Sequence, residues 1–199
     1  MRTNKILLAT IAAMGALSAP LVQADTATCS TAACAAGPLT VNFSINIPSV
    51  MRFSLGATGS NPTVTWSAGT ITSANLGSGT DVNSDTVSNG GAGANGTNQV
   101  RYALLSNLGG TNVTISATGT GGTLTDGGTN TMPYSEIIST PTAVTGAAVS
   151  MPAAGGSTLV GYTSNLINRV GYWNYAFDNT TVYAAGTYTG SITYTATDD

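Results

Sequence analysis

Apolar and polar residues alternate along much of this chain with a period of two, which is the pattern of half-buried β-strands. The most regular run ends at Pro48, and its apolar positions are Leu39, Val41, Phe43, Ile45 and Ile47. Shorter runs of the same kind predict further strands around residues 51–55, 64–66, 100–104, 113–117 and 158–162.

The end of the chain predicts a β-hairpin, with one strand near residues 172–177 and a second over 186–196. In the second strand Tyr188, Ile192 and Tyr194 share one face, and threonines occupy the other. In the first strand Trp173, Tyr175 and Phe177 share one face. Rings on one face are typical of a core, so this pattern favours a core role over an exposed, sugar-stacking platform.

The strands are separated by Gly, Asn and Pro turns, and one long polar loop covers residues 73–97. No amphipathic helix follows residue 24. We therefore predict an all-β fold, a single immunoglobulin-like or pilin-like β-sandwich of about eight to ten short strands. An open barrel is the second choice.

The first 24 residues have the three parts of a secretory signal peptide. Arg2 and Lys5 provide a positive start, Ile6 to Leu17 an apolar run, and Val22 to Ala24 a small-residue cleavage site. We expect residues 25–38 to form an N-terminal arm and residues 39–199 the sandwich domain. The mature chain is then exported to the periplasm, cell surface or extracellular space, without a membrane span.

Removal of the signal peptide leaves three arginines against eight acidic residues, a net charge of −5. A chain with so little positive charge cannot neutralise a phosphate backbone, which argues against nucleic acid as a partner. The only cysteines, Cys29 and Cys34, lie five positions apart in an exported chain without histidine. This spacing favours a local disulfide over a metal site.

The sequence contains few residues suited to catalysis. Glu136 is the only glutamate, and no spacing favours its pairing with Asp126 or Asp178 as a hydrolase would need. We therefore expect no enzyme activity, no catalytic residues and no cofactor. Asp81, Asn83 and Asp85 resemble the start of a calcium loop, but Thr86 and Ala92 replace the Gly and Glu such a loop needs, which favours an ordinary solvated loop.

The segment Ala185 to Thr195 includes Gly186, Tyr188, Ile192 and Tyr194. It resembles the last-strand motif of spore-coat-protein-U-like secreted pilins and related bacterial surface sandwiches. That resemblance implies an incomplete sandwich, completed by the N-terminal strand of a neighbouring subunit. In such an arrangement residues 39–47 would be the donor strand. The alternation alone favours an ordinary first strand of the chain's own sandwich, and both interpretations stay open. Asp198 departs from the pilin pattern, which has Tyr or Phe second from the end.

Taken together, these features favour an exported structural protein, a fimbrial or extracellular fibre subunit that assembles by strand exchange. Its expected partners are copies of itself or other surface subunits, with a periplasmic chaperone as an escort. The alternative is a carbohydrate-binding or adhesive sandwich that uses exposed aromatic residues such as Trp173.

Overall fold

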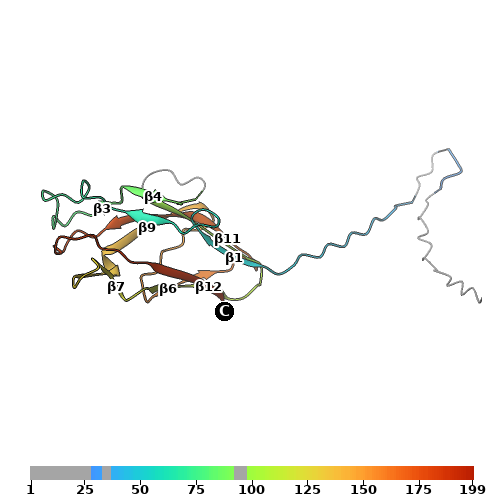
Figure 1. The fold of residues 1–199 in the computed structure, drawn as a ribbon. Helices are drawn as coiled ribbons and strands as arrows, with labels where there is room; N and C mark the ends of the chain where they lie inside the picture. The colour runs from blue at the N-terminus through green and yellow to red at the C-terminus, as the bar shows by residue number, and fades with distance from the viewer. Residues whose placement is uncertain (1–27, 33–36, 92–97) are drawn as a thin grey trace, which may run out of the picture. The chain divides into compact units, whose positions relative to one another are not determined.

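The computed structural model describes residues 28–32, 37–91 and 98–199, and confirms an all-β sandwich (Figure 1). The chain divides into one unit up to Asn46 and a compact unit from Ile47 to Asp199. The compact unit thus begins eight residues after Leu39, the position at which the sequence pattern predicts the start of the domain. The predicted signal peptide lies outside the described residues.

Two sheets form the layers of the sandwich. The first has the strand order β1-β5-β11-β3, and β9 also pairs with β11. These strands are β1 (Met51–Leu55), β3 (Val82–Asn83), β5 (Gln99–Ser106), β9 (Ile137–Thr145) and β11 (Ile167–Phe177). The second sheet has the order β10-β6-β12, formed by β6 (Asn112–Gly119), β10 (Ser157–Gly161) and β12 (Ile192–Asp198). All pairings are antiparallel.

Two small two-stranded sheets and one short 3-10 turn complete the described structure. β2 (Thr63–Thr65) pairs with β4 (Thr86–Ser88), and β7 (Thr123–Thr125) pairs with β8 (Thr131–Pro133). The turn spans Tyr134–Glu136. The β7–β8 hairpin turns at Asp126-Gly127-Gly128, where Gly127 has a left-handed conformation with φ 83°.

The core lies between the two sheets and is centred on Trp173. This side chain is fully buried and donates from Nε1 to the Val149 carbonyl oxygen at 2.8 Å. Its ring lies 5.4 Å from that of Tyr102 in the same sheet and 5.1 Å from that of Tyr194 in the facing sheet, measured between centroids. Tyr175 and Phe177 are buried as well, so the prediction that these rings form core is confirmed.

The predicted terminal hairpin is wrong, because β11 and β12 belong to different sheets. β11 pairs with β5, β9 and β3, whereas β12 pairs with β6. The connection between them crosses from one layer to the other. Period-two alternation reports which face of a strand is buried, but not which sheet the strand joins. Here the two apolar faces meet across the core.

The last strand is also shorter than predicted, because it begins at Ile192 and leaves Gly186 and Tyr188 in the preceding loop. In that loop Thr189 forms an isolated bridge with Thr125 of β7. The chain then passes Gly190, where an added Cβ would lie 2.4 Å from the Tyr134 hydroxyl oxygen. Contacts with the β7–β8 hairpin and Tyr134 therefore determine the path of residues 186–191. Of the four motif residues, Ile192 and Tyr194 lie in the strand.

The predicted strand over residues 39–47 is absent, since these residues belong to no strand in the described part of the chain. Their apolar side chains are exposed to solvent, with Phe43 86% and Ile45 83% exposed. The regular alternation of Leu39, Val41 and Ile47 is therefore not explained by burial within the chain. An interpretation as the first strand of the chain's own sandwich does not agree with this arrangement.

Candidate functional site

Two strand edges bound one open side of the sandwich. β1 pairs only with β5, and β12 pairs only with β6, among the strands that the structure describes. An uncovered strand edge carries unpaired backbone N–H and C=O groups, which can bind another strand. The inward-facing residues of both strands, Met51, Phe53 and Leu55 of β1 and Ile192, Tyr194 and Ala196 of β12, are only partly buried.

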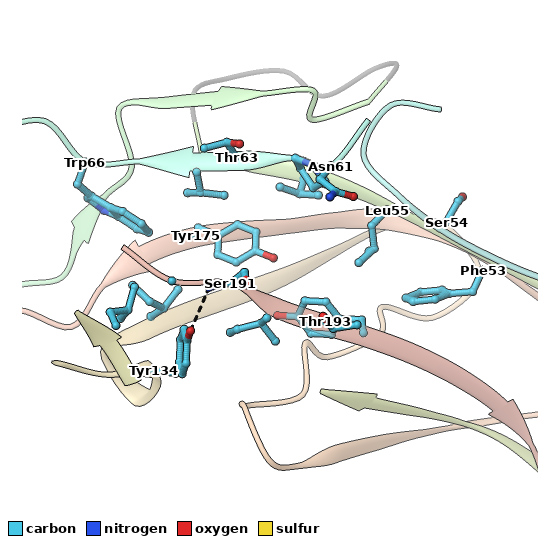
Figure 2. Close-up of a pocket in the computed structure, with 18 residues that line it drawn as sticks. Phe53, Ser54, Leu55, Asn61, Thr63, Trp66, Tyr134, Tyr175, Ser191 and Thr193 are labelled. Carbon is cyan, nitrogen blue, oxygen red and sulfur yellow. Dashed lines mark hydrogen bonds between the residues drawn. The ribbon is translucent and has the colours of Figure 1, made fainter. Parts of the chain in front are cut away.

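A groove of about 650 Å³ lies between these edges. Figure 2 shows side chains of β1, of β2 and of β12 directed into a common space, with Tyr175 on its floor. Trp66, which follows β2, lines the groove near one end and donates from Nε1 to the Val82 carbonyl oxygen at 2.8 Å. Further lining residues are Val64, Val100, Leu124, Ile137 and Thr193.

Tyr134 lines the groove near the beginning of β12. Its hydroxyl donates to the Thr120 carbonyl oxygen at 2.9 Å and accepts a hydrogen bond from the Ser191 backbone N–H at 3.0 Å. The ring packs closely against the backbone, because a Cβ added at Gly119 would lie 2.5 Å from its Cε2 atom. Tyr134 thus fixes the chain just before β12 begins. No pattern in the sequence assigns Tyr134 to this site, because only the fold brings it beside β12.

The groove and the exposed segment have matching chemistry. Among the described residues, none that lines the groove carries a charge, and neither does any residue from Gly37 to Met51. The groove lining is mostly apolar and aromatic, and its hydroxyl-bearing residues include Ser54, Thr63 and Thr193. Such a lining suits an extended, uncharged strand with apolar side chains on one face, since no charge would lose its water on binding.

The start of β1 and the end of β12 lie at the same end of the sandwich. Met51 pairs with Ser106 at the end of β5, and Asp198 pairs with Val113 near the start of β6. The connection between β5 and β6 is short, so these two positions are close. β1 and β12 therefore run in opposite directions along the two sides of the groove.

The linker between the exposed segment and β1 is held to the body of the domain by Asn107. The Asn107 Oδ1 atom accepts a hydrogen bond from the Val50 N–H at 2.6 Å, and its Nδ2 donates to the Pro48 carbonyl oxygen at 2.9 Å. The Asn107 backbone N–H also donates to the Val50 carbonyl oxygen at 3.1 Å. The linker is thus fixed from Pro48 onward. Nothing in the sequence pattern distinguishes Asn107 from other loop asparagines.

The raised pKa values of two tyrosines on the groove floor predict that the protein loses stability at alkaline pH. Burial raises the pKa of Tyr194 to about 12, and burial also raises the pKa of Tyr175, with a further contribution from the charge of Tyr194. Their stabilising effect is complete below the unfolded value near pH 10 and is lost as the pH rises toward 12. Through Tyr194 we expect the free energy of unfolding to fall by about 1.4 kcal/mol per pH unit in this window, and Tyr175 acts in the same direction.

Denaturant titrations at several pH values between 9 and 12 measure this loss. The matched variant Tyr194→Phe removes one titrating group, so its unfolding free energy should fall less steeply than that of the unmodified chain. Equal slopes for the two proteins would contradict this account of the groove floor.

The other sequence candidates lie outside the groove lining. The Asp85 carboxylate accepts hydrogen bonds from the Ser67 N–H and the Thr70 hydroxyl, so it organises a loop, which argues against a calcium loop at residues 81–85. Asp126 caps its own turn, accepting from the Gly128 N–H at 2.8 Å and from Asn130 Nδ2 at 2.7 Å. Among the described residues, no group of three acidic, Cys or His side chains could hold a metal ion.

The predicted disulfide has one partner, Cys34, outside the described residues, so the pair Cys29–Cys34 stays a prediction. Within the described ranges no helix is long and apolar enough to cross a membrane. Comparison of the chain with protein-family models, with curated proteins and with solved structures finds no match.

Proposed function

We propose that this chain is an exported structural protein, a fimbrial or extracellular fibre subunit that assembles by strand exchange. In each step the segment from Leu39 to Ile47 of one copy fills the groove of the next. The observation that carries this proposal is that one chain has both parts, an exposed strand-like segment with five apolar side chains and an open apolar groove.

The direction of the donated segment relative to β12 determines whether assembly gives an open fibre or a segment folded back onto its own molecule. A segment that ran antiparallel to β12 would have Ile47 at the beginning of β12, opposite the end where the acceptor's own β1 begins. Each subunit then offers its groove at one end and its segment at the other, and heterologous contacts of this kind produce open filaments. A parallel segment would have Ile47 at the β1 end, as back-folding onto the same molecule requires. Antiparallel pairing is also slightly more stable per residue.

The proposal also includes export of the chain and a periplasmic chaperone that binds it before assembly. The residues before Asp25 have the pattern of a secretory signal, which sends the chain to the periplasm, cell surface or extracellular space. Before assembly the open edges of β1 and β12 would attract other strands. A periplasmic chaperone that covers the groove is the class of partner that prevents this.

The adhesive alternative loses the one aromatic residue named for it. Its main candidate, Trp173, is fully buried and donates its N–H to Val149, so its ring has no face available for a sugar.

The test compares the mature chain with a variant that lacks residues 25–47. We expect the mature chain to form polymers visible by electron microscopy, and the shortened chain to remain monomeric. A synthetic peptide of residues 38–48 should bind the shortened chain at one to one and raise its melting temperature. If the mature chain stays monomeric and the deletion leaves stability unchanged, the fibre function is lost. Polymers formed by the shortened chain would exclude the donor role of the segment.

A further inference from the structure

The two ends of the sandwich carry small groups of exposed aliphatic side chains. At the end where β1 begins, Val50, Leu108 and Leu166 are each between 42% and 45% exposed; we call these the donor-end group. Val50 lies close to Leu108 because Asn107, the residue before Leu108, forms hydrogen bonds to the Val50 backbone. The Asn107 N–H donates to the Val50 carbonyl oxygen, and the Asn107 side chain accepts from the Val50 N–H. The neighbouring loops also approach each other, since a Cβ at Gly109 would lie 3.8 Å from the Asn165 Cβ.

At the opposite end, Leu76 and Val182 are 39% and 65% exposed; we call them the acceptor-end pair. Figure 1 shows the loops that carry them extending beyond β3, away from the start of β1. Val182 packs on the chain beside Leu76, because a Cβ added at Gly77 would lie 2.6 Å from the Val182 Cγ2 atom. Gly77 has φ 70°, a conformation that glycine adopts without strain.

Asn179 fixes the two loops of the acceptor end to each other. It is fully buried, and its Oδ1 accepts from the Gly77 N–H at 2.9 Å while its Nδ2 donates to the Asn75 carbonyl oxygen at 2.5 Å. The Asn179 carbonyl oxygen also accepts from the Gly79 N–H at 3.0 Å. The exposed aliphatic side chains are therefore presented by an ordered surface rather than by free loops, which lowers the entropy cost of covering them.

We propose that the acceptor-end pair of one subunit docks on the donor-end group of the next copy of this chain. The inference rests on the proposed function and adds a second contact to it, between the bodies of successive subunits. Nine residues from Leu39 to Ile47 span about 30 Å when extended, against about 23 Å for the seven residues of β12, so the segment fills the whole length of the groove.

The length of the linker then determines how close the two bodies must be. Ile47 lies at the end of the acceptor where β12 begins, and the next residue, Pro48, is already bonded to Asn107 of the donor body. One or two residues span no more than about 7 Å. The donor end of one subunit and the acceptor end of the next therefore meet, and the exposed aliphatic side chains there are buried together.

The test uses polymers of the full mature chain and the variant Leu76→Ser/Val182→Ser. We expect subunits to dissociate from variant polymers about ten times faster, at a fixed guanidinium concentration, than from unmodified polymers, because lost burial acts mainly on dissociation. Leu159→Ser is the matched control, since Leu159 is 63% exposed on β10, away from both ends, and its dissociation rate should not change.

Leu108→Ser tests the opposite side of the same contact. It should accelerate dissociation to a similar degree, and combining it with Leu76→Ser/Val182→Ser should add little, because both remove one contact. Monomer melting temperatures serve to exclude an effect on folding. Absence of polymer from the unmodified chain would overturn the fibre function and this contact together. Polymers that dissociate at the unmodified rate in both end variants would overturn the contact alone.

Discussion

Replacing Phe43 by aspartate should abolish fibre growth and leave the sandwich folded. Phe43 is the central apolar residue of the exposed segment and the most exposed of its five, so its removal costs the monomer no packing. In the fibre it would enter a groove whose described lining residues are all uncharged. Burial of an unpaired carboxylate there costs several kcal/mol, which corresponds to at least about a hundredfold weaker binding of the segment.

Ser44→Asp is the matched control for this variant. It adds the same charge one residue later, on the opposite face of the segment, which points to solvent when Phe43 points into the groove. Polymer yield after equal incubation, measured by electron microscopy and sedimentation, should be normal for Ser44→Asp and lost for Phe43→Asp. Equal yields for the two variants would show that the groove does not bind the apolar face of the segment in preference to the opposite face.

Truncation of Trp173 to alanine should destabilise the monomer by about 3–5 kcal/mol, the usual range for removal of a large buried aromatic side chain. Trp173 contacts Tyr102 in its own sheet and Tyr194 in the other, so the truncation removes packing between the two layers. It also leaves the Val149 carbonyl oxygen without the donor that Trp173 supplies. Because Tyr194 lies on the groove floor, the segment should bind more weakly as well.

Denaturant unfolding measures this effect, with Tyr172→Ala as the control. Tyr172 is the neighbouring residue on the opposite face of β11 and is partly exposed, so its loss should cost less than about 1 kcal/mol. A cost for Trp173→Ala no larger than that of the control would contradict a core centred on this ring. Folded Trp173→Ala protein that had lost binding to sugars would revive the adhesive alternative.

Several strands could be predicted from the sequence because their apolar residues keep strict alternation. Residues 51–55, 100–104 and 113–117 all lie in strands, and the inward parity of Trp173 in β11 is as predicted. β9 was missed as a strand, because Pro141 interrupts it and proline normally argues against a strand. β9 accepts Pro141 because it pairs with β11 alone, so the missing N–H faces no partner strand.

The groove could be predicted only in part. The alternation of residues 39–47 and the apolar face of the last strand are visible in the sequence, and the resemblance to secreted pilins connects them. Tyr134, Trp66 and Asn107 were not assigned, because their roles depend on contacts with residues distant in the chain. Trp66 bonds to Val82 and Tyr134 to Thr120 and Ser191, and only folding brings these groups together.

The sequence by itself determined the class of the fold and which face of each strand is apolar, because a period of two is a local property of the chain. Whether an apolar face is buried by this chain depends on which strands become neighbours, and that is decided by long-range packing. The tertiary structure alone decided that β11 and β12 face each other across the core. It also decided that β1 and β12 keep open edges, while the most regular apolar alternation in the chain remains exposed.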